Sequence, residues 1–216
     1  MDQGRLTNSR RFGNEILVRR GAGRDGDGGA ERAAQVELGD MTATRVRPGA
    51  GVEPAKFRDA MSRAAAAVHI VTTDGAFGKC GFTATAVCSV TDDPPTVLIC
   101  LNQASGMHAA FEGNGVFCVN TLNAGQQDLA ERFGGRGPVA MEDRFADPRW
   151  QPGSLGAPVL DGAIARLECE VFMVNEVGTH WVIFGRVVAV QSQGGEAALA
   201  YFDREYRRLP AAGENG

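Results

Sequence analysis

The sequence has little of the positive charge that attracts polyanions. Its 22 lysines and arginines stand against 26 acidic residues, which gives a formal net charge of -4. Lysine occurs only at Lys56 and Lys79, so arginine is the ordinary cation of this chain. Proteins that bind nucleic acid or an anionic membrane surface usually carry a basic patch. The composition therefore predicts no nucleic-acid partner and no membrane partner.

Metal-ligand and disulfide patterns are also missing. The five cysteines have no C-x-x-C spacing, and each lies in or beside an apolar run such as "VLICL" or "VFCVN". This pattern is typical of buried free thiols in a reducing compartment, not of a zinc site or a disulfide framework. No apolar run reaches the roughly 18 residues of a membrane span, and no signal-peptide core follows the N-terminal arginines. We expect a cytoplasmic protein.

Two common phosphate-binding loops are absent from the part of the chain that is expected to fold. No G-x-G-x-x-G joins a predicted strand to a predicted helix there, and no G-x-x-x-x-G-K-[ST] occurs. The glycine-rich "FGGRG" does not open a helix. Neither a Rossmann site nor a P-loop is supported.

Composition divides the chain into three parts. Residues 1–52, with stretches such as "RRGAGRDGDGGAERAAQ", are rich in glycine and charge and poor in aromatic residues. Such a segment buries too little apolar surface to offset the entropy cost of ordering, so we expect a disordered extension, with Met41 as an alternative start. Residues 53–210 are long enough for one domain with a hydrophobic core. A flexible tail is expected over 211–216.

Hydrophobic periodicity within 53–210 predicts many short strands with a few inserted helices. Helices are expected over 54–68, 104–114 and 125–135, and strands over 68–75, 79–91, 96–102, 116–122, 163–178 and 180–193. The last two strands meet in a tight hairpin at "VGTH", residues 136–161 are expected to be a long loop, and a strand is expected within 198–209. This order favours a mainly β fold, an antiparallel barrel with short helices at its rim.

The strand within "GFTATAVCSVTDDPP" (81–95) has unusually small side chains. A period of two would place Thr83, Thr85 and Ser89 on one face, with only Val87 among them. A half-exposed strand that favours threonine explains this pattern equally well, because threonine is a good strand former. A row of hydroxyls along a binding site is the other interpretation.

A second polar group follows the strand at 96–102. "LNQAS" places Asn102, Gln103 and Ser105 directly before a predicted helix, where free backbone N–H groups attract anions. The same residues are also ordinary helix caps. The sequence therefore predicts either an anion site or a capped helix start here.

Several motifs in one order resemble a known family. They are "FRDAM", "GFTATAVCSVTDDPPTVLICLN", "FCVNTL", "LAERFGG", "VGTH" and "YFDREY", and together they cover about residues 55–209. Their order and wording are similar to those of the flavin reductase family of two-component monooxygenases. Within it, the chain most resembles the reductases of pyrimidine utilisation. The resemblance implies an FMN-binding split barrel, antiparallel and Greek-key-like, and it does not extend to residues 1–52.

The resemblance also implies positions for the site. Thr83, Ala84, Thr85 and Ser89 would contact the isoalloxazine edge and ribityl chain of the flavin. The run Asn102, Gln103, Ala104 and Ser105 would hold the phosphate, with Asn120 and Phe133 nearby. His180 would face the nicotinamide, although a polar residue at a hairpin turn is also ordinary. His69 and His108 are expected to be structural. Trp181 is expected either to pack or to shield the nicotinamide.

The implied activity is hydride transfer from NADH to FMN, with FAD or riboflavin as alternative flavins and NADPH as an alternative donor. Reduced flavin would pass to a partner monooxygenase, and the reductase would be a homodimer. Small side chains and hydroxyls suit this chemistry, because the cofactors carry the reaction and the protein positions them. Two other interpretations remain open at this point: a flavin-binding carrier or sensor without turnover, and a reductase that serves an aromatic hydroxylase.

Overall fold

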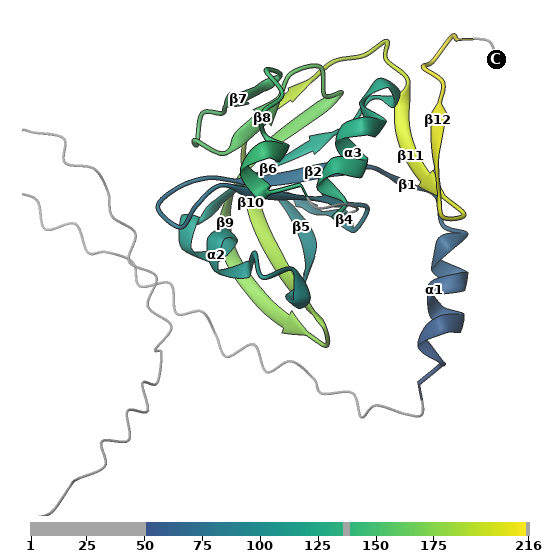
Figure 1. The fold of residues 1–216 in the computed structure, drawn as a ribbon, viewed down its shortest axis with the longest axis horizontal. Helices are drawn as coiled ribbons and strands as arrows, with labels where there is room; N and C mark the ends of the chain where they lie inside the picture. Colours follow the sequence, from purple (N-terminus) through teal and green to yellow (C-terminus); the bar gives the residue numbers. More distant parts are fainter. Residues whose placement is uncertain (1–50, 136–138, 215–216) are drawn as a thin grey trace, which may run out of the picture. The chain divides into compact units, whose positions relative to one another are not determined.

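A computed structural model describes residues 51–135 and 139–214 of the chain (Figure 1). The disordered extension predicted for 1–52 therefore lies almost entirely outside the described residues, as do the last two residues of the predicted tail.

Seven antiparallel strands form the main sheet. The two long strands in its middle, β9 (Ala165–Val177) and β10 (His180–Ser192), pair with each other. The first half of β9 also pairs with β6 (Val116–Thr121), and the first half of β10 also pairs with β5 (Pro95–Asn102). Register shifts between Phe184 and Gly185 and between Val187 and Ala189 bend this central hairpin, as bulges do in barrels. The order across the sheet is β3 (Cys80–Ala84), β2 (His69–Thr73), β6 (Val116–Thr121), β9 (Ala165–Val177), β10 (His180–Ser192), β5 (Pro95–Asn102) and β4 (Val87–Asp92). The expected antiparallel architecture is confirmed.

Alternate residues of these strands enter two separate cores. Val71 packs inside the barrel with residues of β5, β6, β9 and β10, and Phe111 of α2 (His108–Asn114) joins them. Its neighbour Ile70 faces the other way and packs with Leu129 and Phe133 of α3 (Gln127–Phe133). Helices α2 and α3 therefore cover opposite faces of β2, as period-two alternation requires. This confirms the short helices that were predicted within 104–114 and 125–135.

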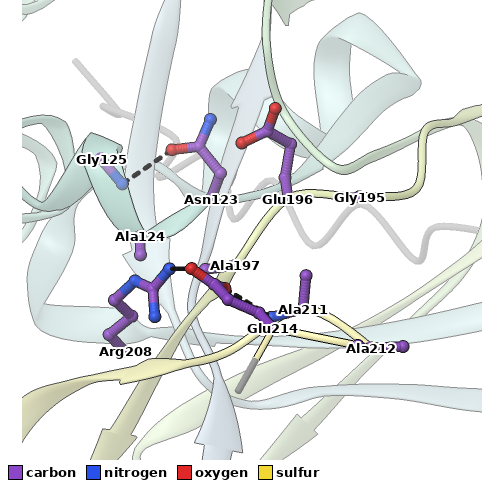
Figure 2. Close-up of a pocket in the computed structure, with 11 residues that line it drawn as sticks. Asn123, Ala124, Gly125, Gly195, Glu196, Ala197, Arg208, Ala211, Ala212 and Glu214 are labelled. Atoms are coloured by element: carbon purple, nitrogen blue, oxygen red, sulfur yellow. Dashed lines mark hydrogen bonds and ion pairs between the residues drawn. The ribbon is translucent and has the colours of Figure 1, made fainter. Parts of the chain in front are cut away.

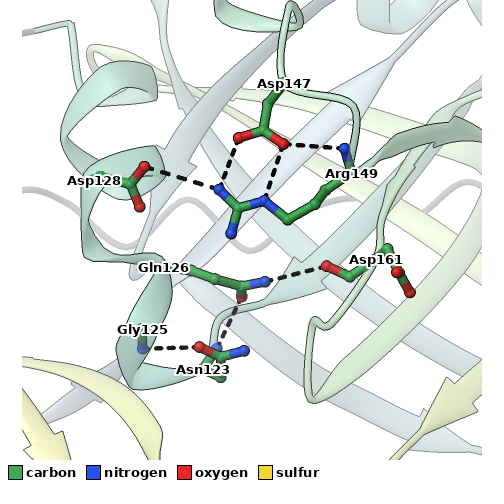
Figure 3. Close-up of polar contacts among 7 residues, drawn as sticks. All are labelled: Asn123, Gly125, Gln126, Asp128, Asp147, Arg149 and Asp161. Carbon is green, nitrogen blue, oxygen red and sulfur yellow. Dashed lines mark hydrogen bonds and ion pairs between the residues drawn. The ribbon is translucent and has the colours of Figure 1, made fainter.

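Polar contacts fix the start of α3 to the segment that follows it (Figure 3). Asn123 and Gln126 form a capping box around η2 (Ala124–Gln126), and Gln126 Nε2 donates to the carbonyl of Asp161 at 3.2 Å. Arg149 forms two hydrogen bonds with the Asp147 carboxylate, at 2.9 and 2.7 Å, and lies 3.8 Å from Asp128. The guanidinium lowers the pKa of Asp147 to about 2, so this carboxylate stays ionised in mild acid.

The prediction of one long loop over 136–161 is wrong for the part that is described. It contains α4 (Met141–Arg144) and a hairpin of β7 (Trp150–Pro152) and β8 (Pro158–Leu160). The Asn120 side chain holds β8 in place: its Oδ1 accepts from Leu160 N at 2.7 Å. Glycine and proline content suggested irregular backbone, but tertiary contacts order this segment.

A third, three-stranded sheet lies at the end of the domain. It consists of β1 (Ala66–Ala67), β11 (Ala198–Phe202) and β12 (Glu205–Leu209). The expected C-terminal strand is thus a hairpin, whose turn places Asp203 and Arg204 at positive φ. The first helix, α1 (Pro54–Ser62), ends six residues before the predicted end and is tied to this turn by Arg204–Asp59 and Arg63–Asp203 ion pairs.

Candidate functional site

The stretch from Cys80 to Asp92 joins the two edges of the main sheet. It was predicted as one strand, but β3 ends at Ala84 and β4 begins at Val87, and these strands lie at opposite ends of the sheet order. Thr85 and Ala86 alone connect them, and both are exposed. The chain thus passes from one edge of the sheet order to the other within two residues, both of which have small side chains.

This crossing changes which side chains share a face. Ala84 packs in the barrel core and is only 7% exposed, and Val87 packs against the same core. Strict alternation would have put Ala84 and Val87 on opposite faces. Thr83 points the other way, toward α3, and its Oγ1 donates to the Ala130 carbonyl at 2.6 Å. The predicted single row of hydroxyls is therefore wrong, and only Thr85 and Ser89 are exposed.

The residues after β5 form a short 3₁₀ turn, η1 (Gln103–Ser105). Asn102 caps it, with its Oδ1 accepting from Ala104 N at 2.9 Å, and Ser105 Oγ donates to the Asn102 carbonyl at 2.7 Å. Gly106 then turns the chain at φ +70° before α2 begins. The capping interpretation thus holds locally. Asn102, Ala104 and Ser105 are nevertheless exposed, so the turn still presents polar groups outward.

Three segments that are distant in sequence meet around this turn. His180 is the cross-strand partner of Asn102, and Gln103 N donates to the Thr179 carbonyl at 3.1 Å. Cys100 N donates to the Ala86 carbonyl at 3.1 Å, which places the crossing beside the end of β5. The structure therefore brings together the crossing at 85–86, the η1 turn and the β9–β10 hairpin.

His180 lies at the start of β10 and is partly exposed. Its Nδ1 is 2.9 Å from Thr179 Oγ1, so this hydroxyl helps to set the orientation of the ring. His180, expected to face the nicotinamide, thus lies beside Asn102, expected to hold the phosphate.

Two predicted site residues belong to the interior. Asn120 is 0% exposed, and its amide bonds to the Ile70 carbonyl at 3.1 Å and to Leu160 N. Phe133 is 2% exposed and packs with Phe145 and Trp150 in the core beneath α3. Neither side chain reaches the exposed site in this structure, because both are used to hold neighbouring elements together.

The stacked pair of His108 and Trp181 was not predicted. Their ring centroids are 4.0 Å apart with an interplanar angle of 18°, and His108 Nε2 lies 3.2 Å from Glu112 Oε2. His108 opens α2, three residues after Ser105, and Trp181 follows His180 in β10. Only the position of Trp181 next to His180 signalled this contact in the sequence.

His69 lies opposite Ala84 and is mostly buried. Its Nδ1 is 3.0 Å from Thr121 Oγ1, and burial lowers its pKa to about 4, from an ordinary value of 6.5. The neutral ring is thus favoured in the folded protein, in agreement with the predicted structural role.

The lowered pKa of His69 predicts an acid-sensitive fold. Between pH 6.5 and about 4 the unfolded chain takes up a proton that the folded chain does not, so stability is full above this window and falls through it. The expected loss is roughly 3 kcal/mol. Urea unfolding across this range should show a smaller loss for His69→Gln. Parallel losses in both proteins would contradict this origin.

Two cavities of the chain lie away from this site. One, of about 500 Å³, is lined by Asn123–Gly125, Gly195–Ala197, Arg208 and Ala211–Glu214. Figure 2 shows Arg208 and Glu214 pointing toward one another there, and they form an ion pair. The other, of about 130 Å³, lies around Arg166 and Glu168. Neither cavity includes a predicted site residue. The candidate site is therefore the region where the crossing at 85–86, the η1 turn and the β9–β10 hairpin come together.

Among the described residues, no helix is both long and apolar enough to cross a membrane.

Comparisons with known proteins agree on one family. Residues 61–210 match the model of the flavin reductase like domain. An NADH-dependent FMN reductase, RutF, from Pseudomonas syringae pv. syringae (strain B728a) is 51% identical, over 77% of this chain and 92% of that protein.

Solved structures give the same result. A protein assigned as a flavin reductase from Haemophilus somnus 129PT superposes with a TM-score of 0.69 at 41% identity, over 73% of this chain and all of that one. BorF, the flavin reductase component of a bacterial two-component tryptophan halogenase, has a TM-score of 0.69 at 31% identity, over 73% of this chain and 99% of its own.

Proposed function

The chain belongs to the flavin reductase family, and on that premise we propose that it is an NADH-dependent FMN reductase. The observation that carries this proposal is the family match over residues 61–210, which includes the crossing, the η1 turn and the β9–β10 hairpin. The proposal is tested by whether NADH oxidation depends on added FMN.

The residues around the crossing fit a flavin. Thr85 and Ser89 are exposed hydroxyl residues, and β3 is an edge strand whose outer backbone groups are not used by the sheet. Hydroxyls and backbone groups can both donate and accept, so they suit the carbonyl oxygens and the N–H of an isoalloxazine edge, while the Thr83 and Ala84 side chains pack to opposite sides of β3. Hydride transfer itself is the chemistry of the nicotinamide and the flavin. The protein has to bind and orient both rings.

The η1 turn fits the phosphate end of FMN. Asn102 and Gln103 carry side-chain amides and Ser105 a hydroxyl in one turn. The Ser105 hydroxyl donates to the Asn102 carbonyl and the Gln103 amide to Glu176, so both side chains would rotate to reach a phosphate. Amides and hydroxyls are hydrogen-bond donors for phosphate oxygens. The turn lies beside Ala86 through β5, so one ligand can reach both places.

His180 is placed to bind the nicotinamide nucleotide. Replacement by alanine removes its ring and should lower kcat/KM for NADH about tenfold, the cost of about one good hydrogen bond. The affinity for FMN, measured by quenching of flavin fluorescence, should stay within about twofold because the flavin donors remain. An unchanged kcat/KM would contradict the role. If the wild type binds FMN but never oxidises NADH, the chain is a carrier or sensor instead.

We propose that the reduced flavin serves a separate monooxygenase in pyrimidine breakdown. The support is the similarity of the motifs to that group of reductases and the identity to RutF. Supplying this reductase, FMN and NADH to a pyrimidine monooxygenase should start substrate consumption. If the reductase supports turnover by an aromatic hydroxylase and not by the pyrimidine monooxygenase, the proposed partner is wrong. The proposed reduction of FMN by NADH would still stand.

A homodimer is part of the proposal. The outer face of β4, β5, β10 and β9 carries an apolar row: Cys88 opposite Leu98, Leu98 opposite Phe184, and Phe172 beside Phe184 with ring centroids 6.2 Å apart. Phe172 is 46% exposed. Apolar surface of this kind favours a protein interface. Light scattering of the full chain should give twice the monomer mass, and a monomer at working concentration would contradict the proposal.

We also propose a cytoplasmic location. All five cysteines are free in the structure, which suits a reducing compartment in which NADH is present.

A further inference from the structure

The stretches that form the proposed phosphate site hold no lysine or arginine. None occurs between Lys79 and Arg132, and none occurs over 175–185 around the β9–β10 hairpin. His108 and His180 are the only histidines in these stretches. A phosphate bound there depends on well-placed neutral donors, whose strength is set by geometry. The affinity for a phosphate therefore depends more strongly on the exact position of the η1 turn than it would in a site that has a lysine or arginine.

The two ends of this turn are held in different ways. At the first end, Asn102 pairs with His180 across the sheet, and Gln103 N donates to the Thr179 carbonyl. At the other end, Gly106 sits at φ +70°, a conformation that glycine adopts freely. Backbone hydrogen bonds thus fix the start of the turn, whereas its exit is held mainly by the side chains that follow Gly106, the first of which, Met107, packs against the barrel core.

The His108–Trp181 stack ties this exit to β10 as well. His108 follows Gly106 by two residues, and its ring lies flat against Trp181, 4.0 Å between centroids. Trp181 is held in β10 opposite Leu101, the residue before Asn102. Glu112, one helical turn after His108, lies 3.2 Å from its Nε2 and fixes the orientation of the ring. Both ends of the turn are therefore fixed to the same strand, β10.

We propose that His108 is a positioning residue for the flavin phosphate. By stacking on Trp181 it holds Asn102–Ser105 in the conformation that receives a terminal phosphate, so the enzyme prefers FMN to riboflavin. This inference rests on the proposed FMN reductase function. The proposed role concerns only the choice between flavins with and without a phosphate. His108 does not have to contact the flavin ring or the nicotinamide ring.

The test compares FMN with riboflavin, which lacks the phosphate. In His108→Ala the KM and the Kd for FMN should rise about tenfold, the upper range for one aromatic pair. The values for riboflavin should stay within about twofold, and kcat should be unchanged. His108→Phe keeps a stacking ring and should restore FMN affinity. Ala109→Ser, at an exposed position of the same helix, is the matched control and should keep the FMN preference.

The outcomes separate this inference from the proposed function. If His108→Ala changes both flavins equally or neither, or if His108→Phe fails to restore FMN affinity, the positioning role is overturned. If His108→Ala does not fold, His108→Leu carries the same test, because it keeps bulk without a ring. A wild-type protein that reduces neither flavin would instead overturn the proposed function.

Discussion

Replacing Gly185 by valine is expected to lower the free energy of unfolding by about 3 kcal/mol. Gly185 is buried in β10, where a Cβ atom would lie 2.5 Å from Cε1 of Phe117 and 2.8 Å from Cβ of Cys169. Both neighbours are 0% exposed, so neither side chain can swing into solvent. The barrel backbone would have to move, because a packed interior has no spare volume.

Chemical denaturation of the full chain measures this loss. Gly194→Val is the matched control: Gly194 is exposed, and an added Cβ there would meet no atom within 4 Å. The control should change stability by less than about 0.5 kcal/mol. If Gly185→Val is as stable as the control, the described packing of β6 against β10 is incorrect.

Thr85→Leu is expected to raise the Kd for FMN at least about tenfold while leaving thermal stability nearly unchanged. Thr85 is exposed and lies in the crossing between β3 and β4, so a larger side chain costs little in folding. In the proposed site it would fill space beside the isoalloxazine edge and remove a hydroxyl. Ala84 is a poorer test position, because it is 7% exposed and packed in the barrel core.

A matched substitution separates this effect from a general one. Thr91→Leu places the same side chain at an exposed position of β4, beside Thr96 near the other end of β5. Fluorescence titration should give it wild-type FMN affinity. If Thr85→Leu binds FMN as tightly as Thr91→Leu does, the flavin lies against a different wall.

The elements with regular periodicity were predictable from sequence. The long hairpin of β9 and β10, the buried strand β5 and the helix α3 occur close to their expected ranges, because their alternation or helical spacing is strong. The resemblance of the motifs also assigned His180 and Asn102 to one site, and the two residues are cross-strand partners in the structure.

What the sequence could not reveal depends on tertiary contacts. Nothing local marks Thr85 and Ala86 as a crossing, since strand-forming residues continue on both sides. Asn120 looks like a ligand residue by type, yet its amide is used by Leu160 N and the Ile70 carbonyl. The β7–β8 hairpin is ordered by such contacts and not by its own glycine- and proline-rich sequence.

The central claim is that this chain passes hydride from NADH to a flavin that it binds at the crossing and the η1 turn. The most direct measurement is anaerobic mixing of the purified full chain with NADH, with and without added FMN. NADH should be oxidised only when FMN is present, with one FMN bleached for each NADH consumed. NADH oxidation that does not depend on flavin, or no oxidation with FMN, would contradict it.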